Sequence, residues 1–302
     1  MITRTILFLS ALLSAQLIFS QGCSDAGACS VESLNFDDGE TKGHSRLKLN
    51  VEQTLGSGEK LIFISQTTAG IQYRILKATL LEMRIPFIYT NGNLGHTSGV
   101  GDLILSVNHR LASFGESNWS IIAGGRIKSN NADKSFNNSP LPMAYQTSLG
   151  TYDIILGSFY SIPKWDFYAA YQHPFGRNQN SYLVNNATLP DNLRYYESNK
   201  LKRGDDLYFR TRRFLELRNH NSFIINALLI YRLQEDEIYK NDLNIQLPGS
   251  KGLTFNIGLS YSKKLKNQRK LEYSLAFPII DKNYRADGLT RNIVLGIRLT
   301  NL

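Results

Sequence analysis

After its first twenty residues, the sequence lacks any uninterrupted apolar run of about twenty residues, the length that a transmembrane helix needs. This absence excludes helical membrane spans. A helical hydrophobic period is also missing throughout the chain. The mean hydropathy of −0.25 is typical of a soluble protein. A transmembrane β-barrel also gives such a value, however, because every second residue of its strands faces inward and can be polar.

Catalytic motifs are missing as well. The sequence has no Gly-x-Ser-x-Gly elbow, phosphate loop or dinucleotide fingerprint. Its five histidines stand singly, and none forms a pair with metal-ligand spacing. We therefore expect no enzyme, cofactor or metal site. An outer-membrane hydrolase with Ser and His on adjacent strands remains an alternative, because such a site needs no local motif. The histidines are His44, His96, His109, His173 and His220.

The net charge of +9 raises the question of nucleic-acid binding. The basic residues are spread through the chain and do not cluster with aromatic residues, so we expect no nucleic-acid partner. They are better placed to contact lipid phosphates at a membrane rim or to line a lumen.

The N-terminus has the features of a secretion signal. Arg4 precedes the apolar run Ile6–Leu13, and small Ser20 ends the segment, so we expect a signal peptide over residues 1–20. Residues 21–43 are acidic and rich in small residues, and we expect them to form a periplasmic lead-in. Cys23 and Cys29 predict a small disulfide loop there. The alternative is a lipid-modified Cys23, which Gly22 favours but Ser20 and Gln21 do not.

The main positive signal is strict alternation of apolar and polar residues, which is typical of β-strands with one apolar and one polar face. Between Val100 and Leu111, for example, Leu103, Leu105 and Val107 alternate with polar residues. Twelve segments of this kind are predicted as strands: Arg46–Leu55, Leu61–Leu76, Leu80–Thr90, Val100–Leu111, Trp119–Asn130, Gln146–Ser161, Trp165–His173, Asp206–Leu217, Ser222–Leu233, Leu253–Leu265, Leu271–Ile280 and Arg291–Leu302.

The connections between these segments alternate in length. Short ones follow the even-numbered strands, and mostly longer polar ones follow the odd-numbered strands, with about thirty residues in Pro174–Gly204. Short periplasmic turns and long external loops are the expected asymmetry of an outer-membrane barrel. We therefore predict an all-β fold, a single antiparallel transmembrane β-barrel of about twelve strands over residues 44–302. Its location would be the outer membrane of a Gram-negative bacterium, with a periplasmic N-terminus.

The polar strand faces carry charges of both signs. Placing such a charge against lipid at mid-membrane costs about 2–4 kcal/mol, so these faces should line the lumen. There the charges would either pair across strands or form a selectivity lining for anions. The candidates are Arg84, Asp102, Arg110, Arg126, Asp153, Arg210, Arg212, Glu216, Arg232 and Arg298.

Two stretches resemble a known family. One is Gly99–Leu105, which begins Gly-Val-Gly-Asp at a strand start and runs into Arg110-Leu111. The other is Gln146–Gly157, which contains Gly150-Thr151-Tyr152-Asp153 and is preceded by Leu141-Pro142. Together they resemble the outer-membrane transporter family named after the meta-pathway of phenol degradation. The opening Cys23…Cys29 resembles exported proteins of the Bacteroidetes type. The first resemblance implies a barrel that passes small hydrophobic or aromatic compounds, and it transfers no catalytic residue.

Taken together, the sequence predicts a channel or transporter for small molecules. Its expected partners are outer-membrane lipid, a small-molecule solute and the barrel-assembly machinery during insertion. The last strand ends in Leu302 where barrels commonly have an aromatic residue. A structural or surface-interaction barrel with a plugged lumen remains the alternative outside the enzyme class.

Overall fold

The computed structural model describes residues 46–184, 190–218, 221–266, 269–289 and 291–301. The predicted signal peptide, the lead-in with Cys23 and Cys29, and the positions His220 and Leu302 lie outside this set. Among the described residues, no helix is long and apolar enough to cross a membrane.

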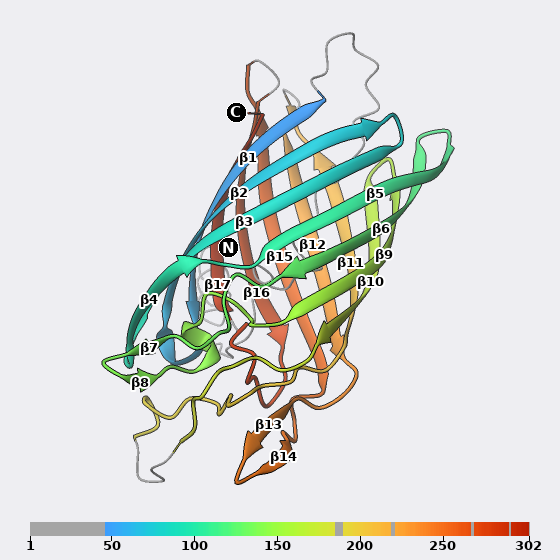
Figure 1. The fold of residues 1–302 in the computed structure, drawn as a ribbon. Helices are drawn as coiled ribbons and strands as arrows, with labels where there is room; N and C mark the ends of the chain where they lie inside the picture. The colour runs from blue at the N-terminus through green and yellow to red at the C-terminus, as the bar shows by residue number, and fades with distance from the viewer. Residues whose placement is uncertain (1–45, 185–189, 219–220, 267–268, 290, 302) are drawn as a thin grey trace, which may run out of the picture.

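The strands form one closed antiparallel barrel of twelve strands, as the alternation predicts (Figure 1). β1 pairs with β17 and with β2, and β2 pairs with β3, which closes the ring. The barrel strands are β1 (Leu47–Gly58), β2 (Phe63–Leu76), β3 (Thr79–Gly92), β4 (Gly95–Val100), β5 (Leu103–Phe114), β6 (Ser117–Ile127), β9 (Tyr152–Ile162), β10 (Trp165–Phe175), β11 (Asp206–Glu216), β12 (Ser222–Arg232), β15 (Gly252–Lys264), β16 (Lys270–Ile280) and β17 (Arg291–Thr300).

β4 and β5 together count as one of the twelve strands of the barrel, because they lie one after the other along the same side of β3. Both pair with β3, β5 along its first half and β4 along its second half. The chain leaves the ladder between them at Gly101 and Asp102, the residues of the first family-like motif. The predicted strand Val100–Leu111 therefore corresponds to β5 and to the end of a longer β3–β4 hairpin.

The two ends of the barrel differ in the length of their connections. The turns after β2, β5, β9, β11 and β15, together with the start of β1 and the end of β17, lie at one end, here called the short-turn end (top of Figure 1). The longer connections lie at the other end, here called the long-connection end. The short β1–β2 and β3–β4 connections also lie at this end. The connections of this end carry two small hairpins and two 3-10 turns: β7 (Ser135–Phe136), β8 (Ser139–Pro140), β13 (Glu237–Lys240), β14 (Leu243–Gln246), η1 (Glu59–Leu61) and η2 (Met143–Tyr145).

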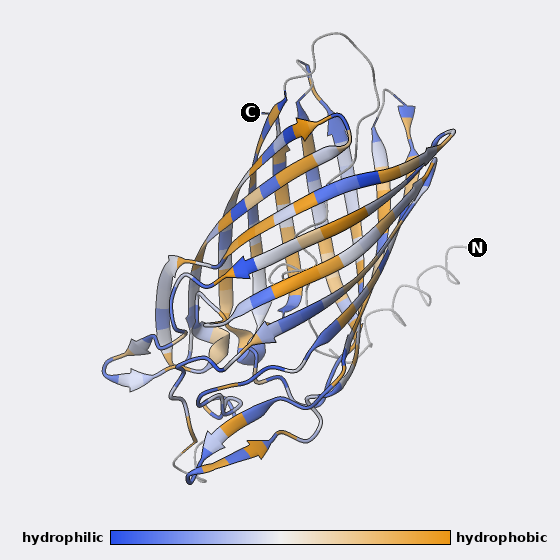
Figure 2. Cartoon of the chain, turned by 45° about the vertical axis from the view of Figure 1, so that its right-hand side comes forward, coloured by the Kyte–Doolittle hydropathy of each residue, from blue (hydrophilic) through white to orange (hydrophobic). Residues whose placement is uncertain are grey.

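The two faces of the wall follow the predicted alternation (Figure 2). On β3, Ile85, Phe87 and Tyr89 point outward with 36–51% exposure, whereas Glu82 and Arg84, on the other face of the same strand, are buried inside. The outward-facing residues of neighbouring strands lie side by side, because residues directly paired in an antiparallel ladder share a face. Apolar side chains thus cover the outside, and most charged strand residues point into the lumen.

Candidate functional site

The lumen is narrowed by residues 141–151 of the connection between β6 and β9, here called the inward segment. Every residue of this segment is buried. Its first part contains η2, and Leu141, Ala144 and Tyr145 pack in one apolar cluster with Ile64 of β2 and Ile88 of β3. An outer loop in water would not bury such a run, so the segment belongs to the interior of the barrel.

Asp102 holds the second part of the inward segment. Its Oδ2 accepts a hydrogen bond from the Leu149 N–H at 3.0 Å, and its Oδ1 accepts one from the Ser129 N–H at 3.1 Å. Gly101 permits the close approach, because a Cβ there would lie 3.0 Å from the carbonyl oxygen of Thr147. The two family-like motifs therefore meet in space, one supplying the carboxylate and the other the backbone that it holds.

Gly150 reverses the chain between the inward segment and β9. Its φ of +73° is left-handed, and a Cβ would lie 2.6 Å from the Asn178 Cβ. The predicted strand Gln146–Ser161 consequently starts only at Tyr152. Residues 146–151 lack the ladder partners of a strand and instead use side-chain acceptors such as Asp102.

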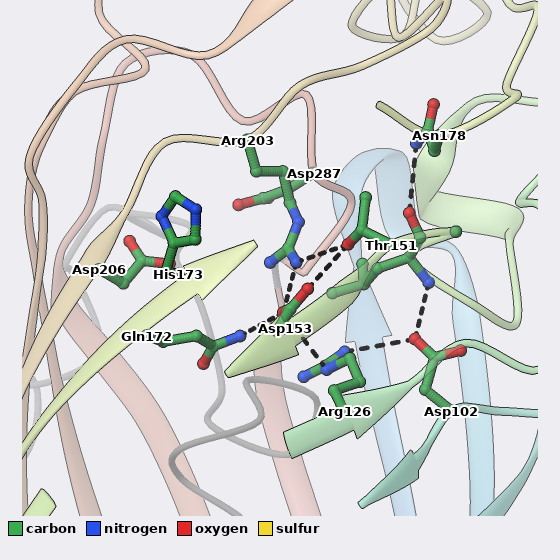
Figure 3. A network of polar contacts seen from close by, with 12 residues as sticks. Asp102, Arg126, Thr151, Asp153, Gln172, His173, Asn178, Arg203, Asp206 and Asp287 are labelled. Atoms are coloured by element: carbon green, nitrogen blue, oxygen red, sulfur yellow. Dashed lines mark hydrogen bonds and ion pairs between the residues drawn. The ribbon is translucent and has the colours of Figure 1, made fainter. Parts of the chain in front are cut away.

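Asp153 is a buried carboxylate of β9. It contacts side chains from the inward segment, from β10 and from the connection between β10 and β11 (Figure 3). Its Oδ2 accepts from Arg203 Nη2 at 2.5 Å and from Gln172 Nε2 at 2.5 Å, and its Oδ1 accepts from the Thr151 hydroxyl at 2.8 Å. Arg126 lies between two carboxylates, 3.7 Å from Asp153 and 3.6 Å from Asp102. This network ties the β10–β11 connection, which carries Arg203, to the barrel wall.

Arg232 is the centre of a second buried network. Its guanidinium contacts Asp206 at 2.8 Å, Asp236 at 2.6 Å and Asp287 at 3.1 Å. These carboxylates come from β11, from the connection after β12 and from the connection after β16. Because every member is nearly solvent-free, the pairing fixes the long connections over the barrel end.

The remaining predicted lumen residues are distributed along the strands. Arg84 and Arg298 share Glu52, at 2.7 and 2.8 Å. Arg212 contacts Asp166 at 2.5 Å, and Arg210 donates to Asn226 at 2.7 Å. Arg110 is half-buried, whereas Glu216 is exposed at the short-turn end. The structure thus brings Asp102, Arg126 and Asp153 together, and it places Arg232 in a separate group. Whether any of these residues selects solutes remains a prediction.

Between the inward segment and the wall lies a cavity of about 60 Å³. Three guanidinium groups and several apolar side chains line it, and the lining also includes Gln66, whose Oε1 has no hydrogen-bond partner. A space of this size holds only a few water molecules. The lining includes Arg84, Arg126, Arg291, Ile104, Leu149 and Leu289.

Several carboxyl groups at the long-connection end have shifted pKa values, among them those of Glu59 and Asp287. Burial raises the pKa of Glu59 to about 7, although Arg285 and Lys60 act in the opposite direction. Burial would also raise the pKa of Asp287, but Lys282 and Arg232 hold it well below the usual range. Asp287 is therefore ionised at neutral pH, whereas Glu59 titrates there.

Sequence reasoning missed several residues of these networks, notably Arg203, Asp236, Asp287 and Asn178. All four lie in connections, where no period marks the inward direction. Asn178 Nδ2 lies 3.4 Å from the Leu149 carbonyl oxygen, and its Oδ1 accepts from the Leu201 N–H at 2.9 Å. For Asn178 and Arg203, the usable signal was the length of the connection between β10 and β11, since long loops often carry function.

Among the described histidines, none hydrogen-bonds to a serine hydroxyl. His109 contacts the Thr79 hydroxyl at 2.9 Å, and His173 contacts Asp205 at 2.7 Å. His96 packs against the Phe136 ring. In the described part of the chain, no group of three or more His, Cys, Asp or Glu is placed to hold a metal ion.

No sequence-family model matches this chain, and no curated protein matches it in sequence. Solved structures do resemble it. An outer-membrane channel from Pseudomonas putida F1 aligns over 88% of this chain and 99% of its own, with a TM-score of 0.61 and 13% identity. The NanC porin aligns over 84% of this chain and 99% of its own, with a TM-score of 0.51 and 10% identity. These likenesses show that the chain has the fold of an outer-membrane β-barrel.

Proposed function

We propose that the protein is an outer-membrane channel for small molecules, oriented with its short turns in the periplasm. The observation that carries the proposal is a closed barrel with an apolar outside and a charged lumen. A polar, charged interior inside an apolar outer face is the arrangement that a water-filled channel needs. The resemblance to the phenol meta-pathway family and the likeness to channels support the same function.

The inward segment sets the size of the solute. Because the cavity beside it is about 60 Å³, the solute must be small or the segment must move during passage. Side-chain contacts such as those of Asp102 and Asn178 hold this segment, and its backbone is not paired with the barrel strands. Displacing the segment therefore leaves the barrel hydrogen bonds intact.

Solute permeation into proteoliposomes tests the proposal. We expect vesicles with the purified protein to swell in small neutral solutes such as glycerol and urea, and to swell more slowly as the solutes grow. Vesicles with heat-denatured protein serve as the control. Swelling equal to that control for every solute would refute the channel and would favour the alternative of a structural barrel with a plugged lumen.

A further inference from the structure

The outer rim of the short-turn end is basic along one arc of the barrel. The arc covers the consecutive strands β10, β11, β12, β15 and β16, together with the β9–β10, β11–β12 and β15–β16 turns. Six cations lie there, of which Arg213 is half-buried and the other five are exposed. This group is here called the basic arc and consists of Lys164, Arg213, Arg218, Lys263, Lys266 and Arg269.

The side chains of the basic arc lie outside the lumen. Arg213 pairs with Ile225, which is 42% exposed on the outer face. Lys263 lies two residues beyond Tyr261, whose ladder partner Tyr273 is 45% exposed. Both cations therefore face outward, because paired residues share a face and so do alternate residues of one strand. The other four cations lie in the turns.

No carboxylate balances the basic arc on the outer side, within the residues that the structure describes. The nearest carboxylates along the chain are Asp166, Glu216 and Glu272. Asp166 is buried inside, and the ladder connects Glu216 and Glu272 through Ser222 and the buried, inward-facing Ser262. All three carboxylates thus belong to the lumen side. Among the described residues, none of the six cations forms an ion pair.

An aromatic and apolar band adjoins the basic arc on the outer face. Arg213 Cζ lies 4.9 Å from the centre of the Trp165 ring, which stacks on Phe167. Phe223 packs against Tyr261 with ring centres 5.4 Å apart. Trp and Tyr at the end of an apolar band mark the level of the lipid headgroups. The cations therefore lie at that level, where the aliphatic stems of Lys and Arg can stay against apolar surface.

We propose that the basic arc binds anionic phospholipid headgroups in the leaflet that surrounds the short-turn end. In the orientation given above this is the periplasmic leaflet, and the binding does not require that the barrel conducts. The positive charge of the arc complements the headgroup phosphates. A soluble anion would contact the cations alone, whereas a phospholipid also places its acyl chains on the adjoining apolar band and removes that surface from water.

Trp165 can report which lipid lies at the basic arc. Replacing Trp119 by phenylalanine leaves Trp165 as the only tryptophan. Vesicles contain equal parts of phosphatidylglycerol and phosphatidylcholine, and either the first or the second lipid carries brominated acyl chains, which quench tryptophan on close contact. We expect brominated phosphatidylglycerol to quench about twofold more than brominated phosphatidylcholine at low salt. The difference should vanish in about 1 M salt, which screens the charges.

A matched pair of variants in this background assigns the preference to the basic arc. Lys164→Gln/Arg218→Gln removes two exposed cations of the arc, and Lys200→Gln/Lys251→Gln removes two exposed cations of the long-connection end. Both variants keep the contact of Arg213 with the reporter ring. We expect only the first to lower the preference for phosphatidylglycerol. If it does not insert, the salt dependence of the parent protein still tests the proposal.

Three outcomes would overturn this assignment. Equal quenching by the two brominated lipids at low salt would exclude selective lipid binding and would favour an acidic protein as the occupant of the arc. A preference that persists in high salt would have a cause other than charge. An equal loss of preference in both variants would place its origin in the overall charge of the protein. None of these results bears on the channel function, which the swelling experiment tests separately.

Discussion

Replacing Asp102 by alanine should release the inward segment and destabilise the protein. The substitution removes the acceptor for two backbone N–H groups, those of Leu149 and Ser129, and the neighbouring charge of Arg126. A hydrogen bond to a charged group contributes about 1.5–3 kcal/mol, so losing two of them should cost about 3–6 kcal/mol. Asp102→Asn keeps one acceptor oxygen and should lose about half as much.

The free energy of unfolding, measured by urea titration of the protein in lipid vesicles, checks this expectation. Glu116→Ala serves as the matched control, because Glu116 is an exposed carboxylate in the short turn between β5 and β6. It should change the free energy of unfolding by less than about 0.5 kcal/mol. A loss of the same small size in Asp102→Ala would show that Asp102 does not hold the inward segment.

Three further predictions concern the faces, the pH dependence and the orientation of the barrel. Leu105→Arg places a charge on the lipid side and should lower the free energy of unfolding by about 2–4 kcal/mol, whereas Ser106→Arg faces the lumen and should lower it less. Equal losses in the two variants would contradict the assignment of faces. Because the pKa of Glu59 is about 7 in the folded protein and about 4.5 unfolded, stability should fall by about 3 kcal/mol between pH 4.5 and pH 7 and then level off. Glu59→Gln should abolish this slope in unfolding titrations, and an unchanged slope would assign it to other groups. In a background with Cys23 and Cys29 replaced by serine, Asn137→Cys should react with an impermeant maleimide on intact cells and Lys266→Cys should not; the reverse pattern would invert the orientation.

The strands were predictable from sequence because the barrel wall imposes a period of two on every one of them. Leu103, Leu105 and Val107 face outward in β5, as their alternation indicated. The family-like residues Asp102 and Asp153 were also identified as inward-facing. Their roles were not, since these depend on the meeting of segments that are distant along the chain.

The inward segment could not be predicted, and its misassignment has a physical cause. Residues 146–151 follow directly into β9 and read as its extension, but Gly150 turns the chain and the preceding backbone finds its partner in Asp102. The Arg232 network is similar, because Asp236 and Asp287 come from two connections that no sequence period orients. Buried ion pairs between loops leave no local signature.

Single-channel recording in planar bilayers tests most directly the central claim that the lumen is a path narrowed by the inward segment. The account predicts small conductance steps for the wild-type protein and clearly larger steps for Asp102→Ala and for Asn178→Ala, which lose contacts to Leu149. The Glu116→Ala control should behave like the wild type. An absence of steps in all of these proteins, with correct barrel insertion, would contradict the account.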